Sequence, residues 1–512
     1  MKQPPQSLTQ QTVAGLLWML YGKGAYALLQ LLVVGVLARL VSPADFGVVS
    51  AALIVIGVSS MFSRLGLGPA LVQRPELEQR HIDTAFATSV LMGLGLGGLV
   101  WLSAGLAAEF FRTPGVEPVL RALAFVFPLQ GLAAVAGSLM MRELRFRWMA
   151  SVDVISYGIG FGAIGITLAL LGVGVWALVL GQIAQLVIKT GILLWGQPPR
   201  LGSLPERRAF RELMYFSGGF TLAKVANQLA QQGDYLMVGR FLGPSALGYY
   251  GRAYHLMSAP AGGFGTILDS VLFPMMARVQ TDEKRLASAY RRGIALIALV
   301  VLPVSAALVV LAPEVIHVLL GPRWTPVIVP FQILAVGMLF RTSSKLSDSL
   351  TRATGAVFRR AWRQTVYAAL VIGGAWVGQQ WGIVGVAWGV LLALAVNFVM
   401  MAQLSMREAG MTASQLWRAH VPAILITLIS SPLVWLLTVA LRHLGVAPVV
   451  VLVAGLTLVL GCYLLLTFVA PTTFLGHDGQ WITDTLRRYV RKLTGSRRAA
   501  TGHTTPAATI EP

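Results

Sequence analysis

The feature that most constrains this chain is a succession of long apolar blocks separated by short basic loops. A helix of about 20 apolar residues spans the ~30 Å hydrocarbon core of a bilayer. Only 12% of the residues are charged and 56% are hydrophobic, whereas soluble domains carry about 25% charged residues. The short segments of alternating polarity that are typical of membrane barrels are absent. The pattern therefore predicts an all-α integral membrane protein.

The blocks predict about fourteen transmembrane helices and five segments of chain. Residues 1–196 form a first lobe of six helices, 197–211 a cytoplasmic linker, and 212–406 a second lobe of six helices. Residues 407–470 add two helices, and 471–512 form a basic tail. The fourteen blocks are 12–40, 46–73, 82–111, 117–140, 148–171, 173–196, 212–242, 246–277, 288–313, 325–351, 360–381, 383–406, 416–441 and 447–470.

The distribution of lysine and arginine predicts the orientation, because cytoplasmic loops are enriched in these residues. Of the 40 Lys and Arg residues, 28 lie on the side of the termini, 7 on the opposite side and 5 inside blocks. We therefore expect a multi-pass protein of the bacterial inner membrane with both termini in the cytoplasm. The net charge of +20 is thereby explained by topology rather than by nucleic-acid binding.

An internal repeat predicts two lobes inserted in the same direction. Arg39, Pro43 and Gly47 recur 201 residues later as Arg240, Pro244 and Gly248. The same offset pairs Lys23 with Lys224 and Gln30 with Gln231, and Gly174 is paired with Gly385 at an offset of 211. Six helices separate the copies, so both have the same sense across the membrane. Such a parallel repeat has its axis along the membrane normal, with the substrate route between the lobes.

Charged residues inside the blocks predict a polar cavity, because each costs at least ~2.5–3.5 kcal/mol in mid-membrane and faces a partner or water. Lys224, Asn227, Gln231 and Asp234 share one helical face, and Lys23 and Gln30 repeat part of it. The alternative interpretation is a set of packing polar groups that specify helix register. The candidate substrate-binding residues are Lys23, Lys224, Arg64, Arg341, Lys345, Gln30, Asn227 and Gln231.

Two acidic residues, Asp234 and Asp269, are candidates for charge partners or for coupling to a cation. No cofactor is predicted, and coupling to H+ or Na+ stays open. No cysteine-based metal site is expected, because Cys462 is the only cysteine. Gly93, Gly95 and Gly98 match a dinucleotide motif but lie inside an apolar block, which favours helix packing. Residues 481–493 have one apolar and one basic face, which predicts an interfacial helix on anionic lipid, followed by a disordered end.

Two stretches resemble the Wzx-type polysaccharide flippases, whose superfamily also holds the MATE drug exporters and the lipid II flippases. They are Ala38 to Gly47, which contains the first copy of the repeat, and Leu65 to Gln73. The resemblance, to the exopolysaccharide and colanic-acid-type branch, covers about residues 10–470. It implies transport of oligosaccharide repeat units linked to undecaprenyl diphosphate, from the cytoplasmic to the periplasmic leaflet, for exopolysaccharide or lipopolysaccharide biosynthesis. The implied partners are this substrate, membrane lipids, and a polysaccharide polymerase with its chain-length machinery.

Two alternatives to a flippase stay open on sequence. A MATE-like, cation-coupled multidrug antiporter needs an acidic pocket, and four intramembrane aspartates nearly balance five intramembrane bases. A membrane scaffold or synthase subunit without transport is the second alternative, and it would leave the repeated polar stripes without a role. The lysines at the repeat-paired positions favour an anionic substrate, since an ammonium group holds phosphate as a point charge. No feature predicts an enzyme.

Overall fold

The computed structural model describes residues 8–63, 67–74, 76–198, 206, 221–476 and 478–481, and among them the regular structure is entirely helical. The first half contains α1 (Leu8–Leu40), α2 (Pro43–Ser63), α3 (Leu67–Gln73), α4 (Gln79–Leu102), α5 (Ala104–Phe110), α6 (Val116–Leu123), α7 (Val126–Arg142), α8 (Phe146–Tyr157), the π-helix η1 (Gly158–Gly165), α9 (Ile166–Leu170) and α10 (Val175–Gly196).

The second half has a similar order of long and short helices, without a described counterpart of α3. It contains α12 (Thr221–Phe241), α13 (Gly243–Arg278), α14 (Glu283–Val310), α15 (Ala312–Leu319), the 3-10 helix η3 (Pro322–Val327), α16 (Ile328–Val336), α17 (Met338–Ala353), α18 (Val357–Gly378), the 3-10 helix η4 (Gln379–Trp381) and α19 (Gly382–Glu408). The chain continues with α20 (Ala413–His443), α21 (Pro448–Val469) and α22 (Pro471–Phe474).

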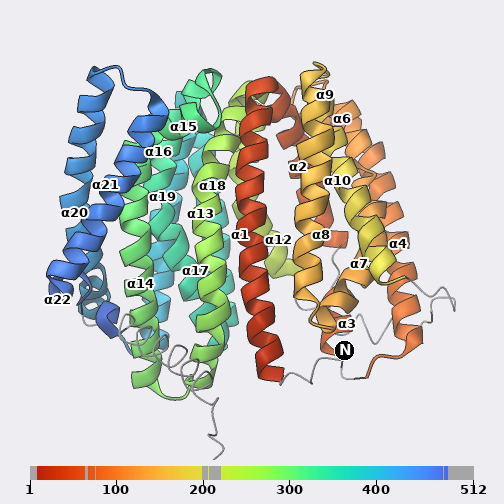
Figure 1. The fold of residues 1–512 in the computed structure, drawn as a ribbon. Helices are drawn as coiled ribbons and strands as arrows, with labels where there is room; N and C mark the ends of the chain where they lie inside the picture. The colour runs from red at the N-terminus through yellow and green to blue at the C-terminus, as the bar shows by residue number, and fades with distance from the viewer. Residues whose placement is uncertain are drawn as a thin grey trace, which may run out of the picture.

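The long helices stand side by side in one layer-like bundle, with α1 to α10 on one side and α14 to α22 on the other (Figure 1). Helices α2 and α13 make extensive contact where the two groups meet. The start of α1 and the short helix α22 lie at the same end of the bundle (Figure 1). In such a bundle the backbone polar groups are paired within the helices, except at the helix ends, as hydrocarbon requires.

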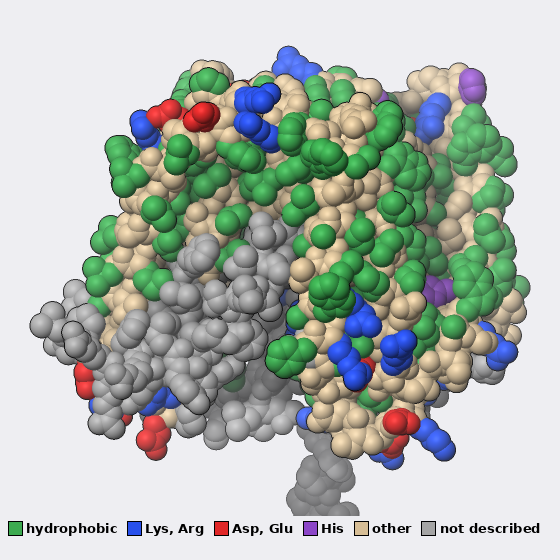
Figure 2. All heavy atoms as spheres, turned by 180° about the vertical axis from the view of Figure 1, so that it is seen from behind, with side chains coloured by type: hydrophobic (Ala, Val, Ile, Leu, Met, Phe, Trp, Pro, Cys, Tyr) green, Lys and Arg blue, Asp and Glu red, His purple; other side chains and the backbone are tan. Residues whose placement is uncertain are grey.

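The outer surface has the composition of a membrane protein. Apolar side chains cover the middle of the bundle and charged ones gather at its two ends (Figure 2). Large apolar residues such as Leu28, Leu102 and Phe468 are 66%, 73% and 86% exposed, far more than a soluble surface tolerates as a continuous belt. The all-α membrane fold predicted from the apolar blocks is therefore confirmed.

The described residues contain 10 helices or helix pairs long and apolar enough to cross a membrane, or 11 if the bent pair 322–336 and 338–353 is one span. One of these spans, Phe358–Glu408, is 51 residues long and contains both α18 and α19. Helices α12 and α13 do not reach the required hydropathy, which is consistent with the polar residues that they carry. The number fourteen stays a prediction.

Several blocks are broken where the sequence predicted one helix. The block 82–111 divides at Ser103, 117–140 divides between α6 and α7, and 325–351 bends by 43° at Gly337. Proline and glycine near these points remove hydrogen bonds or relax the backbone. The predicted linker 197–211, apart from three residues, and the predicted interfacial helix 481–493, apart from Trp481, lie outside the described residues.

Two glycine assignments from the sequence need correction. Of the dinucleotide-like glycines, Gly93 packs closely against Phe127, whereas Gly95 and Gly98 have nothing near them. Gly174 is matched by Gly382 rather than by Gly385. Gly174 and Gly382 have φ angles of 60° and 68° at the starts of α10 and α19, a conformation that favours glycine, whereas Gly385 packs against Gly378.

Candidate functional site

Lys23 lies in the middle of α1 and lines a cavity of about 270 Å³ between α1 and α8. The cavity walls also include Tyr26, Met149 and Asp153. Asp153 is already paired with Lys189 of α10, at 2.7 Å between Oδ1 and Nζ. Lys23 is exposed and forms no ion pair among the described residues. It is therefore a cation available to an anion or to water.

Gln30, two turns further along α1, reaches the second half of the chain. Its Nε2 lies 3.4 Å from Nε2 of His255 on α13. The residue that the repeat pairs with it, Gln231, is exposed on α12. The side chains of Lys224 and Asn227, and the whole of Arg64, lie outside the described residues. The shared polar face that the sequence predicted for α1 and α12 is thus described only in part.

A buried polar cluster joins α12, α13 and α17. Asp234 is 1% exposed and accepts a hydrogen bond of 2.6 Å from the hydroxyl of Tyr250. Arg341 of α17 donates to the hydroxyl of Tyr254, and its guanidinium carbon lies 5.1 Å from the centre of that ring. Tyr235 packs edge-on against both other tyrosines. The tyrosines thus separate Asp234 from Arg341 instead of allowing a direct ion pair.

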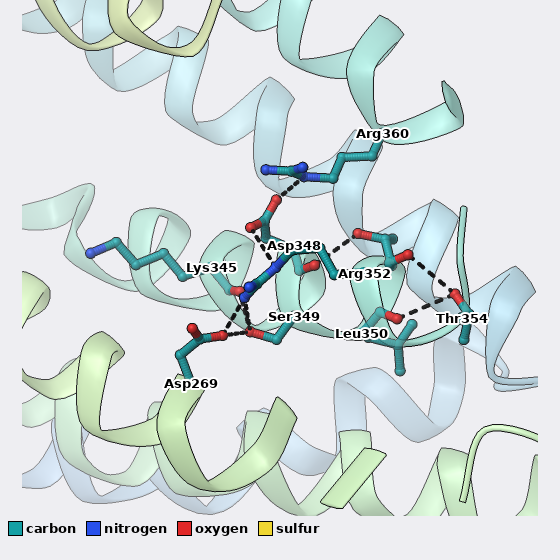
Figure 3. A network of polar contacts seen from close by, with 9 residues as sticks. Asp269, Lys345, Asp348, Ser349, Leu350, Arg352, Thr354 and Arg360 are labelled. Atoms are coloured by element: carbon teal, nitrogen blue, oxygen red, sulfur yellow. Dashed lines mark hydrogen bonds and ion pairs between the residues drawn. The ribbon is translucent and has the colours of Figure 1, made fainter. Parts of the chain in front are cut away.

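A second cluster lies in the last part of α17 (Figure 3). Asp269 of α13 accepts from Ser349 and pairs with Arg352 at 2.5 Å. Asp348 pairs with Arg352 at 3.4 Å and also with Arg360 of α18. The sequence left two roles open for Asp269, neutralising a base or holding a coupling cation. In this state it neutralises Arg352.

Lys345 belongs to this region but not to its ion pairs. Its side chain extends away from Asp269 and Asp348 (Figure 3). Its aliphatic stem lies against the backbone of Gly265 on α13, where an added Cβ would come within 2.9 Å of Cδ. No described carboxylate forms an ion pair with Lys345. Lys345 and Arg341 lie one helical turn apart on α17, so together they present two cations near α13.

Sequence reasoning did not select Arg252, which it counted among the seven Lys and Arg residues on the side opposite the termini. Arg252 lies on α13 nine residues after its start at Gly243, and its guanidinium carbon lies 4.4 Å from the ring centre of Phe46 on α2. Its Nε is buried without a hydrogen-bond partner among the described residues. Arg252 lies only six residues inside the apolar block 246–277, close to the predicted loop, and was therefore not counted as an intramembrane charge. The position of Arg252 inside that block was the available signal.

A family model described as "Polysaccharide biosynthesis protein" matches residues 36–329, more than half of the chain. The chain belongs to this family. The match includes both copies of the arginine–proline–glycine repeat, Arg252 and the whole of α13. The flippase resemblance drawn from the first copy is therefore confirmed at the level of the family.

Relatives of this polysaccharide biosynthesis protein come from several bacteria. Lipopolysaccharide biosynthesis protein WzxC of Escherichia coli (strain K12) is 24% identical over 407 residues, which are 77% of this chain and 80% of WzxC. Succinoglycan biosynthesis transport protein ExoT of Rhizobium meliloti (strain 1021) is 30% identical over 318 residues, covering 60% of this chain and 62% of ExoT. Teichuronic acid biosynthesis protein TuaB of Bacillus subtilis (strain 168) is 22% identical, covering 77% and 82%.

The fold of this family member is also that of known transporters. The lipid II flippase MurJ in an inward closed conformation superposes with a TM-score of 0.71 at 12% identity, covering 88% of this chain and 98% of MurJ. A multidrug resistance MATE transporter of the MOP superfamily, in an inward-facing conformation, gives 0.54 at 16% identity, covering 77% and 96%. The protein is therefore a multi-pass membrane protein with the fold of these transporters.

Proposed function

We propose that this protein is a flippase that moves oligosaccharide repeat units, linked to undecaprenyl diphosphate, from the cytoplasmic to the periplasmic leaflet for exopolysaccharide or lipopolysaccharide biosynthesis. The observation that carries the proposal is an excess of cations where α13 meets α2 and α17. Arg252, Arg341 and Lys345 lie there, and Asp234 is the carboxylate of the adjoining cluster. The names of the relatives and the MurJ-like fold support the same function.

The excess of positive charge favours an anionic substrate over the cations that a multidrug antiporter exports. Asp269 and Asp348 are already paired with Arg352 and Arg360, so they offer little charge to a cationic drug. A diphosphate would be held by charge-assisted hydrogen bonds from guanidinium and ammonium groups. Outward movement of a negative charge releases ~2.3 kcal/mol per charge per 100 mV of membrane potential, which supplies part of the driving force without ATP.

We propose the following roles for the remaining candidates. Lys23 and Lys224 hold the diphosphate from matching positions of two lobes, residues 12–196 and 212–406, and Arg64, Gln30, Asn227 and Gln231 line the same route. Asp269 is the charge partner of Arg352, and Asp234, which tyrosines separate from Arg341, is a coupling group. Both termini lie in the cytoplasm, and the polymerase with its chain-length machinery receives the product. The matching arginine, proline and glycine positions of the two halves support the division into lobes.

The test is polysaccharide export in a strain that lacks the chromosomal gene and carries plasmid-encoded variants. Arg252→Gln, Arg341→Gln and Lys345→Gln each remove one charge and are expected to weaken substrate binding about 10- to 100-fold, since a hydrogen bond to a charged group contributes ~1.5–3 kcal/mol. Arg323→Gln is the matched control, because Arg323 is an arginine exposed on η3. Protein level in the membrane fraction is measured for each variant.

Lys23→Gln, Lys224→Gln and their double variant are compared in the same assay. Normal export by all three, at normal protein level, would make these lysines structural and leave the role of substrate binding to Arg252, Arg341 and Lys345. If Arg252→Gln, Arg341→Gln and Lys345→Gln also export normally, the flippase proposal is contradicted. Lys345→Arg is expected to rescue export partly, because it keeps the charge and changes the shape of the group.

A further inference from the structure

The repeated arginines end the first long helix of each half of the chain, and each contacts the other half. Arg39 lies in the last turn of α1, and its Nη2 donates a 2.7 Å hydrogen bond to the carbonyl oxygen of Val318 on α15. Val318 is in the last turn of α15, where carbonyl groups have no partner within the helix. The C-terminal end of a helix also carries partial negative charge. The guanidinium therefore stabilises the contact both by its hydrogen bond and by its attraction to this charge.

Arg240 makes the corresponding contact in the reverse direction. It lies in the last turn of α12, and its Nη1 donates to the carbonyl oxygens of Glu109, at 3.2 Å, and Phe110 on α5. Its guanidinium carbon also lies 5.3 Å from the ring centre of Phe110. Helix α5 follows α4 as α15 follows α14. The first half thus holds the second through Arg39, and the second holds the first through Arg240.

The repeated prolines and glycines pack between these two arginines in the same reciprocal way. A Cβ added to Gly47 would lie 1.7 Å from the carbonyl oxygen of Pro244, and one added to Gly248 would lie 2.0 Å from that of Pro43. Such reciprocal contacts are the mark of a two-fold interface. No other residue type allows backbones to approach this closely. Beside them, the indole nitrogen of the fully buried Trp324 donates a 2.8 Å hydrogen bond to the carbonyl oxygen of Ala38.

We propose that Arg39 and Arg240 are paired gating residues of the transport step, which hold the periplasmic end of the route shut while substrate enters from the cytoplasm. This rests on the proposed function and topology, which place the ends of α1 and α12 at the periplasmic face. Both contacts join the two halves at the end opposite the start of α1. Moving the halves apart there breaks both arginine–carbonyl contacts and separates Gly47 from Gly248. We call these two contacts, Arg39 with Val318 and Arg240 with Glu109 and Phe110, the latch.

The latch is tested by the accessibility of one introduced cysteine. Cys462, the only cysteine, is replaced by Ala, and Ser50→Cys places a thiol on α2, one turn inside Gly47 and facing Gly251 of α13. A membrane-impermeant maleimide is added to spheroplasts, so that it reaches the periplasmic end only. Arg39→Ala and Arg240→Ala are each expected to raise the labelling rate about tenfold, since a hydrogen bond from a charged group contributes ~1.5 kcal/mol or more. The double variant is expected to raise it further.

Several variants separate a latch from general damage. Arg39→Lys, which keeps one cationic donor, is expected to restore slow labelling. Gly248→Ala, which forces the halves apart without touching an arginine, is expected to speed it. Arg323→Ala and Gly263→Ala are controls, because Arg323 is exposed on η3 and nothing lies near Gly263. Unchanged labelling in the folded double arginine variant, or an equal increase in the Arg323→Ala control, would overturn the latch.

The labelling experiment measures how accessible the introduced cysteine is, whereas the export assay measures transport, so the two outcomes are scored separately. Accelerated labelling together with normal export by the Arg252, Arg341 and Lys345 variants would leave the latch standing and contradict the flippase proposal. Unchanged labelling together with lost export by those variants would contradict the latch and leave the flippase proposal standing. The thermal unfolding midpoint of each purified variant establishes that it is folded.

Discussion

Arg442 and Glu314 form a two-point ion pair that joins α20 to α15. Nε and Nη2 of Arg442 donate to the two carboxylate oxygens of Glu314 at 2.7 and 2.8 Å. Nη2 also donates to the carbonyl oxygen of Val310 at 3.0 Å. The Glu314 side chain is 5% exposed, so its charge has been taken almost completely out of water. This pair holds the end of the added helices α20 and α21 to the second half of the bundle.

Arg442→Met is expected to destabilise the protein by about 3–5 kcal/mol, because it leaves a buried carboxylate without a partner. The measurement is thermal unfolding of the purified protein in detergent. Adding Glu314→Leu to Arg442→Met is expected to recover most of the loss, since the unpaired charge is then gone. A smaller loss for Arg442→Met alone than for the double variant would contradict this account.

The hairpin of α18 and α19 depends on four glycines that bring its backbones together. A Cβ on Gly378 would lie 2.4 Å from the carbonyl oxygen of Gly385, and one on Gly389 would lie 2.3 Å from that of Gly374. Gly378→Leu is therefore expected to abolish stable folded protein in the membrane fraction. Gly373→Leu is the matched control, because nothing lies near Gly373, and its level should equal that of the parent.

The hydrogen bond between Tyr250 and Asp234 predicts different effects for two substitutions of the aspartate. Asp234→Asn keeps an acceptor for the buried hydroxyl of Tyr250, whereas Asp234→Leu removes it at a cost of about 1–3 kcal/mol. We expect Asn to leave the unfolding temperature near that of the parent and Leu to lower it. Export by the folded Asn variant then reports on coupling, because the charge is lost while one acceptor oxygen for Tyr250 is kept. Full export by Asp234→Asn would exclude Asp234 as a coupling group.

The predicted topology is tested by fusing a reporter that reads cytoplasm or periplasm. Fusions at Arg208 and Arg360 are expected to read cytoplasmic, and fusions at Gly115 and Pro322 periplasmic. The physical reason is the unequal distribution of Lys and Arg between the two sets of loops. Reversal at any two of these positions would refute the fourteen-helix arrangement and the position of the proposed latch.

The apolar blocks by themselves determined the fold class, because hydrocarbon leaves a spanning chain few arrangements other than helices. The spacing of Arg39, Pro43 and Gly47 against Arg240, Pro244 and Gly248 likewise showed a repeat without any coordinates. The apolar blocks and the repeat both lie along the linear sequence, so hydropathy reveals the first and a constant offset reveals the second. The candidate bases Arg341 and Lys345 were found for the same reason, as charges in an apolar context.

Only the tertiary structure decided which charges are available and which are neutralised. Asp269 and Lys345 look alike as intramembrane charges, yet Arg352 pairs with the first and nothing described pairs with the second. Arg252 was missed because it lies near the start of its block, and only its contact with the Phe46 ring on α2 shows that it is buried between the halves. The reciprocal contacts of the repeat were equally hidden, since those of Arg39 and Arg240 join residues 279 and 131 positions apart. Charge pairing and backbone contact depend on distances in space, and these arise only when the helices pack.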